Sequence, residues 1–536
     1  MTRSRDASAR SWLDRRQFFR ASAAALVTVV TRPAVSARAA AEPIGLLEIH
    51  RGTRNRRFGP VGAKLPRWGG PPARAKPYAG APRTPLVASA APGRSLAEAL
   101  GEQSPAGFSG EALSAAGLAR LLRLTNGVTG FYGDGASRRP LRAAPSAGAL
   151  YAGEVYVVAE RVNGLAPGLY YYAVEEDALV KLREGALLAR VVQSVERPMA
   201  LAGAAAAVLL SNVFERYTGR YANRGYRYAL IDSGHIGENL GLAARASGLA
   251  ERAFSRFHDE QLNALLEIDG VSEAVCALHA VGHPGRGAAA AGAAERQLAE
   301  AATLGVAPRG GSLPERYHQA TKLVGAVGPA APVAEGAVPQ LPVAPSGSAT
   351  RRLPAAAGSQ APLDHAIRIR RSTTTFVESP APLEGLALVL DAALAPGHPP
   401  RAEQVELLFA VNRVEGLAPG LYRFDPSTRR VVELRAGSLA LELVDACLGQ
   451  QLAGRAAVVF LMVGRLEEAA ERGARRYRDL LLEAGAIGQR IYLAAEAEGL
   501  SARNLAAFRD DQANSLLGLD GRTRALVHVT LFGRGD

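Results

Sequence analysis

Residues 162–170 read Val-Asn-Gly-Leu-Ala-Pro-Gly-Leu-Tyr, and residues 414–422, which lie 252 positions later, read Val-Glu-Gly-Leu-Ala-Pro-Gly-Leu-Tyr. Further matches, spaced by 251 positions, pair Gly234 with Gly485, Asp259 with Asp510 and Gly282 with Gly533. A repeat of this length is a duplicated domain rather than a short solenoid unit. The chain therefore contains one domain twice, and we call the two occurrences copy one and copy two.

The spacing of the repeat is larger near its beginning. Residues 50–54 correspond to residues 318–322, and Phe108 corresponds to Phe376, in each case 268 positions later. The decrease from 268 to 252 places about sixteen additional residues in copy one, between Phe108 and Glu154. Copy one therefore carries an insertion that copy two lacks.

Hydrophobic periodicity predicts the same order of strands and helices in both copies. In copy one it indicates strands at 154–159, 168–173, 204–211 and 271–281 and a long helix at 228–247. In copy two it indicates strands at 405–412, 420–424, 456–463 and 525–532 and helices at 382–393 and 475–498. Strands and helices mixed in one compact unit predict an α+β fold for each copy.

These patterns divide the 536 residues into five parts. They are an N-terminal segment at 1–41, an extended Pro-, Gly- and Arg-rich lead-in at 42–95, domain 1 at 96–285, an Ala/Pro/Gly-rich linker at 286–362 and domain 2 at 363–536. An Ala-rich helix and a Gly turn are expected at 285–312. Each domain is long enough to bury a core of its own.

Composition excludes several classes of function. The net charge of +13 comes mainly from arginines that are scattered along the chain, so no basic stripe predicts nucleic-acid binding. The two cysteines, Cys276 and Cys447, occupy non-equivalent places in the copies and have no metal or redox spacing. The sequence also lacks a phosphate-binding Gly-rich loop, a nucleophile elbow, a metal triad and a dinucleotide fingerprint.

The N-terminus has the pattern of a twin-arginine export signal. Arg15 and Arg16 precede Phe18 and Phe19, an apolar run follows at 21–30, and small residues end in an Ala triplet at 39–41. The apolar run is too short to span a membrane permanently. This route carries folded proteins, so it suits a chain that acquires a tight cofactor before export. The mature protein is predicted to be periplasmic or otherwise extracytoplasmic, with the twin-arginine export machinery as a partner.

Several segments together resemble the SagB-type dehydrogenases of the nitroreductase superfamily. They are Pro145-Ser146-Ala147-Gly148-Ala149-Leu150-Tyr151, the Pro-Gly-Leu-Tyr turn, Arg224-Gly225-Tyr226-Arg227-Tyr228, Asp232-Ser233-Gly234-His235 and Glu238-Asn239-Leu240. The resemblance covers nearly all of the mature chain, twice. Members of that superfamily are FMN-dependent oxidoreductases that form dimers and hold each flavin at the interface. The resemblance therefore implies an FMN cofactor, an antiparallel sheet flanked by helices in each copy, and an intramolecular pseudo-dimer.

The family's basic element is intact only in copy two. In the family an Arg-Arg-Ser element holds the flavin phosphate, a role that suits guanidinium groups because they bind oxyanions bidentately. Copy two has Arg370, Arg371 and Ser372, followed by Thr374, whereas copy one has Glu-Gln-Ser at 102–104. An acidic residue there would repel a phosphate. The resemblance thus assigns phosphate binding to copy two.

The family's small-residue element is intact only in copy one. Pro145, Ser146, Ala147 and Gly148 match the segment whose backbone approaches the isoalloxazine from the partner subunit, whereas copy two has Gly-His-Pro-Pro-Arg-Ala-Glu at 397–403. Two prolines remove backbone donors from that loop.

In the family the basic element and the small-residue element of one site come from different subunits. The two surviving elements therefore belong to one composite site, while the other site is dismantled. The same family geometry brings Ser501, Ala502 and Arg534 of copy two to this flavin. Independent drift of both copies is the alternative, although drift has no reason to spare matching halves.

The catalytic residues follow from the same resemblance. Family members that oxidise azolines to azoles have a Lys-Tyr pair before the Arg-Gly-Tyr-Arg run, and this chain has Arg220 and Tyr221 there. Arginine is a poor base, so Tyr221 is the candidate acid or base if Arg220 lowers its pKa. The alternative is that both residues only pack or pair at the domain interface. His235 is open to the same two interpretations.

The predicted function is an exported FMN-dependent dehydrogenase or oxidase that takes hydride from a small-molecule or peptide substrate. Reduced nicotinamide is a cytoplasmic donor, so oxygen or a quinone-linked acceptor is expected to receive the electrons. Two alternatives remain: a non-catalytic flavin-binding or scaffold protein in peptide maturation, and a general nitro or quinone reductase. The insertion around 125–142, with Phe131 and Tyr132, is expected to shape the cleft, but side-chain types alone do not define the ligand.

Overall fold

The computed structural model describes residues 44–56, 59–60, 75–87, 94–102, 107–135, 138–286, 296–301, 311–329, 349–355, 358–395 and 404–535. The predicted export signal at 1–41, Ser104 of copy one and the copy-two segment 397–403 lie outside these residues.

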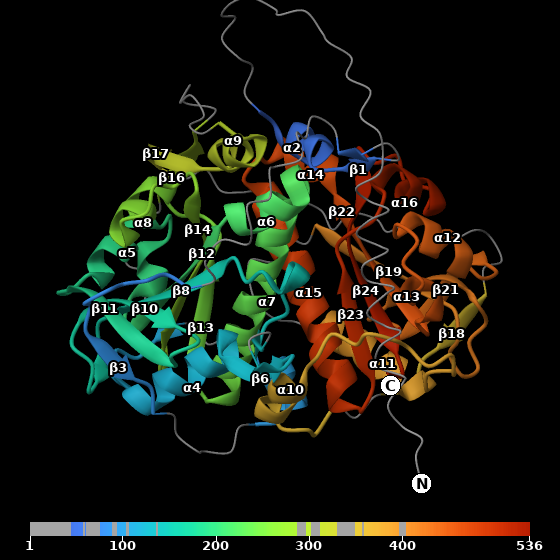
Figure 1. Ribbon diagram of the computed structural model, residues 1–536, viewed down its shortest axis with the longest axis horizontal. Helices are drawn as coiled ribbons and strands as arrows, with labels where there is room; N and C mark the ends of the chain where they lie inside the picture. Colours follow the sequence, from blue (N-terminus) through green and yellow to red (C-terminus); the bar gives the residue numbers. More distant parts are fainter. Residues whose placement is uncertain are drawn as a thin grey trace, which may run out of the picture.

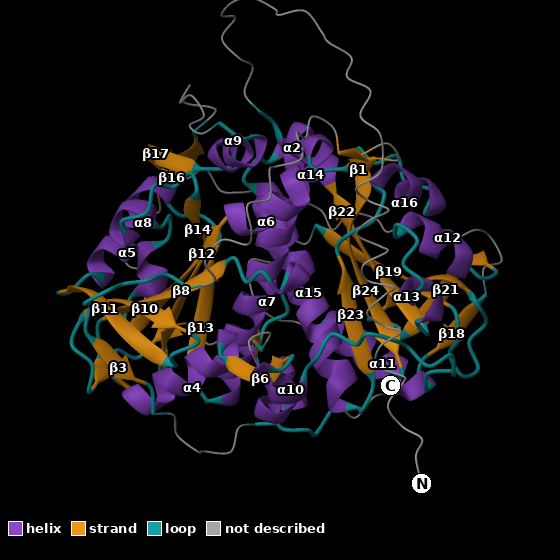
Figure 2. Ribbon diagram, viewed as in Figure 1, coloured by secondary structure: helices purple, strands orange, loops and turns teal. Residues whose placement is uncertain are grey.

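Each copy is built on a seven-stranded antiparallel sheet, and the two sheets lie on opposite sides of the molecule (Figure 1). The order in copy one is β13-β14-β12-β8-β10-β11-β3, and copy two has the equivalent order β23-β24-β22-β19-β20-β21-β18. The copy-one strands are β3 (Arg83–Pro85), β8 (Gly153–Ala159), β10 (Gly168–Ala173), β11 (Ala178–Glu184), β12 (Ala206–Val213), β13 (Ala250–Phe254) and β14 (Glu273–Gly282). The copy-two strands are β18 (Thr350–Arg352), β19 (Val405–Val411), β20 (Gly420–Asp425), β21 (Arg430–Ala436), β22 (Val458–Arg465), β23 (Ser501–Leu505) and β24 (Arg524–Gly533). The predicted α+β class is confirmed, with helices flanking both sheets (Figure 2).

The repeated Pro-Gly-Leu-Tyr stretch forms the entry to β10 and to β20. A methyl group on Gly168 would lie 2.4 Å from the Arg183 carbonyl oxygen, so only glycine fits beside the neighbouring strand. The Tyr170 hydroxyl donates to the Ala166 carbonyl at 2.7 Å and closes the turn. Tyr422 makes the same bond in copy two at 2.8 Å. The motif therefore recurs because it builds the same turn and strand start twice.

Two long helices meet at the centre of the molecule, between the sheets (Figure 1). They are α7 (Gly225–Ala246), which is buried throughout, and its counterpart α15 (Arg476–Ala497). A methyl group on Gly234 would lie 2.2 Å from the Leu482 carbonyl oxygen, and one on Gly485 would lie 2.1 Å from the Ile231 carbonyl oxygen. The repeated glycines thus allow the two backbones to touch, and they make the copies an intramolecular pseudo-dimer.

Further helices cover the sheets and their edges. In copy one they are α3 (Leu96–Gly101), α4 (Ala115–Asn126), α5 (Leu188–Ser194), α6 (Glu215–Tyr221) and α8 (Asp259–Leu266). In copy two they are α10 (Leu363–Ile369), α11 (Leu383–Ala393), α12 (Ala440–Ala446), α13 (Leu452–Arg455), α14 (Leu466–Glu471) and α16 (Asp510–Leu516). None of the described helices is long and apolar enough to cross a membrane.

The lead-in and the linker each contribute a helix that joins the two copies. Thr53, after α2 (Leu46–Gly52), accepts a hydrogen bond from Nε of Arg227 in α7 at 2.7 Å. Arg227 also donates to Asp510 of copy two at 2.7 Å. Each of these side chains is buried, so the contact is a charged bridge between the copies.

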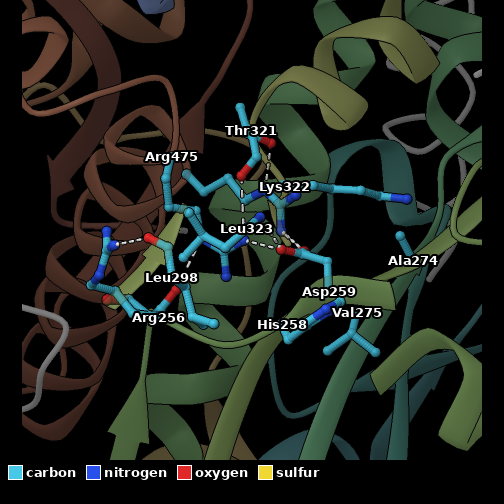
Figure 3. A network of polar contacts seen from close by, with 12 residues as sticks. Arg256, His258, Asp259, Ala274, Val275, Leu298, Thr321, Lys322, Leu323 and Arg475 are labelled. Atoms are coloured by element: carbon cyan, nitrogen blue, oxygen red, sulfur yellow. Dashed lines mark hydrogen bonds and ion pairs between the residues drawn. The ribbon is translucent and has the colours of Figure 1, made fainter. Parts of the chain in front are cut away.

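The same network occurs a second time with the copies exchanged. Thr321, after α9 (Leu313–Ala320), accepts from Nε of Arg478 in α15 at 2.6 Å, and Arg478 donates to Asp259 of copy one at 2.6 Å. Arg475 binds the other oxygen of Asp259 at 2.7 Å, and the Leu323 amide donates to that oxygen as well (Figure 3). We call these two networks the interdomain locks.

The linker differs from the predicted Ala-rich helix at 285–312, because the described part contains the strand β16 (Arg296–Glu300). This strand pairs antiparallel with β17 (Leu323–Pro329). The amide of Leu298 donates to Glu196 at 2.7 Å, and its carbonyl accepts from Arg256 at 3.0 Å. Contacts with copy one therefore override the helical propensity of this stretch.

The insertion of copy one forms a hairpin after α4. Its strands are β6 (Val128–Tyr132) and β7 (Arg139–Arg142), which pair antiparallel. Phe131 and Tyr132 are about half exposed on this hairpin, and the Arg138 guanidinium lies 3.7 Å from the centre of the Phe131 ring. The small-residue element follows directly after β7.

Candidate functional site

Arg370 joins the basic element of copy two to copy one. It follows α10, is 4% exposed, and donates from Nε to the Ala143 carbonyl at 3.0 Å and from Nη2 to the Arg142 carbonyl at 3.1 Å. Its guanidinium lies 5.2 Å from the centre of the Tyr492 ring. Nη1 is buried without a hydrogen-bond partner. A buried cationic donor of this kind fits an anion that would complete its hydrogen bonds.

The rest of the basic element lies at the same contact between the copies. Arg371 is half-buried and donates from Nη2 to the Thr129 carbonyl of β6 at 2.8 Å. Burial lowers the pKa of Arg371, and the neighbouring Arg370 cation lowers it further. The Ser372 hydroxyl lies 2.7 Å from the Tyr492 hydroxyl, and Thr374 is exposed. Two adjacent guanidiniums with a hydroxyl beside them match the charge and donors that a phosphate requires.

The small-residue element of copy one forms a tight, strained turn. Ala147–Ala149 is a single 3₁₀ turn, and φ is positive at Gly148 (62°), Ala149 (53°) and Tyr151 (49°). Positive φ is unfavourable for residues with a side chain, and such strain persists where surrounding contacts hold it. Ser146 supplies one of these contacts, because its hydroxyl accepts from the Tyr151 amide at 2.9 Å.

The two predicted catalytic residues lie against this turn. A methyl group on Gly148 would lie 2.3 Å from the Tyr221 hydroxyl and 3.0 Å from Nη1 of Arg220. Ala222, directly after Tyr221, has φ 48° and ψ −139°, a conformation rare for any residue but glycine. The structure thus brings Arg220 and Tyr221 to the small-residue element, and strained backbone lies on both sides of the contact.

The pKa of Tyr221 differs from the sequence-based expectation. Burial raises the pKa of Tyr221 to about 12, although Arg220 lowers it, so the desolvation of the ring outweighs the neighbouring cation. The condition that Arg220 lowers the pKa of Tyr221 overall is therefore not met. At neutral pH Tyr221 is protonated, and it is suited to donate a proton or a hydrogen bond rather than to accept a proton.

Strand β23 supplies the copy-two side of the site. Ala502 forms a parallel bridge with Ser372, and its carbonyl accepts from the Thr373 amide at 3.2 Å. A methyl group on Gly535 would lie 2.4 Å from the Ser501 hydroxyl, so the C-terminal end also packs here. The Arg534 side chain is exposed and its Nε donates to the Pro380 carbonyl at 3.4 Å. Ser501 and Ala502 therefore adjoin the basic element, whereas the described contact of the Arg534 guanidinium is with another loop.

A chain of polar contacts, built partly from motif residues, crosses between the copies. The Asp232 carboxylate accepts from the Ala147 amide at 2.9 Å and from the Tyr217 hydroxyl, which lies 2.8 Å from the Ser146 hydroxyl. His235, three residues further along α7, has its Nδ1 3.6 Å from Asp232. We call this set, with the copy-two residues described next, the polar chain.

The polar chain continues into copy two. Nε2 of His235 lies 2.7 Å from the side-chain nitrogen Nδ2 of Asn504. The side-chain oxygen Oδ1 of Asn504 accepts a hydrogen bond from the Thr530 hydroxyl at 2.6 Å. The sequence signal for its first part is the spacing of Asp232 and His235, which places both on one face of a helix. Tyr217, Tyr492 and Asn504 carry no such signal, because their partners come from distant parts of the chain.

The opposite interface has different residues at the corresponding positions. Glu251 and His279 stand where the composite site has Ala502 and Thr530, and they pair with each other at 2.6 Å. Alanines at 253 and 486 replace Asn504 and His235, so the polar chain has no counterpart there. Glu102, the counterpart of Arg370, forms an ion pair with Arg94. Among the described residues, the arrangement that fits a phosphate and a flat ring is therefore present at one interface.

Comparison with known proteins identifies the family. The model of the nitroreductase family matches residues 104–283 and 367–534, which together make up more than half of the chain. The chain belongs to the nitroreductase family. Members of this family are generally FMN-dependent oxidoreductases, and the donors of the composite site fit that cofactor.

The chain is also similar to individual proteins. This nitroreductase-family chain is 29% identical over 151 residues to "Putative nitroreductase MJ1384" of Methanocaldococcus jannaschii, a match that covers 28% of the chain and 73% of the relative. A crystal structure named as a putative nitroreductase from Anabaena variabilis superposes with a TM-score of 0.71 at 24% identity, over 92% of this chain and all of that one. The Escherichia coli microcin synthetase McbBCD complex matches 34% of this chain and 70% of that one, at 24% identity and a TM-score of 0.31. The Anabaena structure shows that the two-copy fold is shared.

Proposed function

We propose that this chain is an exported FMN-dependent oxidoreductase of the SagB-like dehydrogenase or oxidase type, with a single flavin between its two copies. The observation that carries the proposal is Arg370, which crosses from copy two to the carbonyls of Ala143 and Arg142 and leaves Nη1 buried without a partner. Arg371 and Ser372 lie beside it, and the strained turn at 145–151 follows from copy one. These direct contacts between the two elements support a flavin site that both copies share.

The residues of the site divide into three roles in this proposal. Arg370, Arg371 and Ser372 would hold the phosphate, while residues 145–148 with Ser501 and Ala502 would lie along the ring system. Bound FMN would supply the transfer of two electrons as hydride. Tyr221, protonated at neutral pH and in contact with Gly148, would hold or deliver a proton at its hydroxyl.

The direction of electron transfer is part of the proposal. A dehydrogenase would take hydride from its substrate while the substrate's proton passes to water. It would then pass two electrons to oxygen or a quinone-linked acceptor, which suits a protein outside the cytoplasm. The raised pKa of Tyr221 favours a second candidate, the reduction of nitro or quinone compounds, because such a reaction consumes a proton that Tyr221 can donate.

Anaerobic half-reactions would test the proposal and separate the candidates. The chain is loaded with FMN, and bleaching of the flavin is followed with NADPH or with an azoline-containing peptide. We expect the peptide to bleach the flavin faster than NADPH, and oxygen or a quinone to restore the colour. Rapid bleaching by NADPH followed by turnover of a nitroaromatic would support the second candidate. Bound flavin that no donor reduces would support a non-catalytic scaffold.

Export is tested separately, because it does not depend on the flavin. Residues 1–41 are fused to a reporter that folds in the cytoplasm, and the periplasmic fraction is measured. We expect export of the fusion, and we expect retention when Arg15 and Arg16 are both replaced by lysine. Equal periplasmic amounts of the two fusions would contradict a twin-arginine signal.

A further inference from the structure

Asp232 occupies the centre of the polar chain. Its carboxylate is almost completely buried and accepts from the Ala147 amide at 2.9 Å and from the Tyr217 hydroxyl. The first contact holds the turn whose strained residues begin at Gly148, and the second connects to Ser146 through Tyr217. One buried carboxylate therefore holds the small-residue element from two directions.

The groups around Asp232 come from three elements. They are Tyr217 from α6, His235 from α7 and the Ala147 amide from the 3₁₀ turn. The charge of Asp232 also acts on Tyr221: burial is the main reason why the pKa of Tyr221 is raised, and Asp232 contributes in the same direction while Arg220 opposes it. The carboxylate is thus close enough to affect the group predicted to handle the proton.

This arrangement exists on one side of the molecule. The residue of copy two at the position of Asp232 is Glu483, and an alanine at 486 takes the position of His235. Glu483 accepts instead from the amide of Gln404 at 3.4 Å. The polar chain accordingly lies at the interface that has the basic and small-residue elements, and its residues are replaced at the opposite interface.

We propose that Asp232 is a positioning residue that fixes the turn at 145–151 through Ala147 and Tyr217. Its negative charge lies next to this turn, where it would lower the reduction potential of a bound flavin. The inference rests on the proposed flavin site. A fixed negative charge in a poorly solvated site opposes the addition of electrons to a nearby group. Removal of the Asp232 charge should make the bound flavin easier to reduce. Removal of the Tyr217 hydroxyl, which donates a hydrogen bond to Asp232, should make the flavin harder to reduce.

The test compares the midpoint potential of FMN bound to the full chain in four proteins: wild type, Asp232→Asn, Tyr217→Phe and Glu483→Gln. Asp232→Asn keeps an acceptor for Ala147 and loses the charge, so a more positive potential is expected. Tyr217→Phe keeps the charge and removes a compensating donor, so a more negative potential and roughly tenfold weaker FMN binding are expected. Glu483→Gln is the matched control and should keep the wild-type potential.

The outcomes separate this inference from the proposed function. Potentials that shift in opposite directions in the two polar-chain variants would support the role of Asp232. Unchanged potentials, or a shift in the same direction in both, would overturn it while leaving the flavin site intact. If Asp232→Asn binds no flavin, the midpoint potential of Tyr217→Phe decides: a more negative potential supports the role of Asp232, and an unchanged or more positive one overturns it. A wild-type chain that binds no FMN would overturn both the inference and the proposed function.

Discussion

At the scale of single residues, Arg370 carries most of the case for phosphate binding. It is buried, it bridges the copies, and one of its guanidinium nitrogens lacks a hydrogen-bond partner. Replacement by alanine should cost about 1.5–3 kcal/mol of FMN binding energy, or roughly a ten- to hundredfold increase in Kd, because a hydrogen bond to a charged group is lost. Fluorescence titration of the apoprotein with FMN would measure this.

The matched control for Arg370 lies at the same place of the repeat in copy one. Glu102→Ala removes the side chain at the equivalent position, where an ion pair with Arg94 is the described contact. We expect FMN affinity close to wild type in this variant. Equal losses in the two variants would contradict an asymmetric site.

Tyr221 makes a second residue-level prediction, which concerns pH. With a pKa of about 12, Tyr221 remains protonated throughout the neutral range, and any alkaline loss of activity from this group should appear near pH 12 rather than near its ordinary value of 10.0. Tyr221→Phe should lower turnover by about two to four orders of magnitude, the usual contribution of a general acid or base, without loss of bound flavin. Steady-state rates across pH would test both points.

The same shift affects stability, and its sign follows from linkage. The pKa of Tyr221 is higher in the folded chain than in the unfolded chain, so its stabilising contribution is fully present below pH 10 and is lost as pH rises toward about 12.

The control for the predicted loss of turnover in Tyr221→Phe is Tyr228→Phe, a change in the aromatic neighbour whose ring centre lies 4.9 Å away. Comparable loss of turnover in Tyr221→Phe and Tyr228→Phe would contradict a specific role for Tyr221.

At the scale of elements, the contact between α7 and α15 depends on a pair of glycines from the repeat. A methyl group on Gly234 would lie 2.2 Å from the Leu482 carbonyl oxygen. This oxygen and the Gly234 Cα both belong to packed helix backbone, which has little room to move. Gly234→Ala should therefore destabilise the fold by about 1–3 kcal/mol, despite the better helix propensity of alanine. The urea midpoint of the chain is the measurement.

Gly101 provides the control for this prediction. It ends helix α3, and a methyl group there would meet nothing within 4 Å. Gly101→Ala should leave the urea midpoint unchanged or raise it slightly. If Gly234→Ala were equally harmless, the close approach of the two helices would be wrong.

Elements with a strong internal pattern were predictable from the sequence. The strands at 168–173 and 405–412 and the helix at 475–498 follow hydrophobic periodicity, and the structure has them within a few residues. The strand β16 was not predictable, because partners distant in sequence, Glu196 and Arg256, fix its backbone. The same reason explains the site: motifs indicated Arg370 and Ser146, but not Tyr492 or Asn504.

At the scale of the whole molecule, the structure combines a symmetric framework with an asymmetric site. The two interdomain locks each join one copy to the other, and their distances are closely similar. The Arg227–Asp510 contact measures 2.7 Å and the Arg478–Asp259 contact measures 2.6 Å. Within the described part of the chain, the polar chain and the basic element occur once. The contacts that hold the copies together are therefore repeated, whereas the residues proposed to bind the cofactor lie at one interface.

This contrast predicts that paired mutations in the locks behave alike. Asp259→Asn and Asp510→Asn each leave two buried arginines without their carboxylate, so each should destabilise the chain by about 3–5 kcal/mol. Thermal or urea unfolding of the apoprotein would measure the two losses. A large effect in one variant and none in the other would contradict a symmetric framework.

The pH dependence of one lock has a definite sign. Burial alone would raise the pKa of Asp259, but Arg475 and Arg478 outweigh it and hold the pKa below its ordinary value of 3.8. A carboxylate with a lowered pKa stabilises the fold above its unfolded value and loses that contribution as pH falls through the folded one. The ion pairs of Asp259 with Arg475 and Arg478 should therefore persist in mildly acidic solution.

The central claim is that the two copies form one flavin site, not two. The most direct measurement is the amount of FMN released per polypeptide on denaturation of the purified chain, together with its visible spectrum before denaturation. We predict about one FMN per chain, bound by the basic element of copy two and the small-residue element of copy one. Two FMN per chain, or none after reconstitution, would contradict the account.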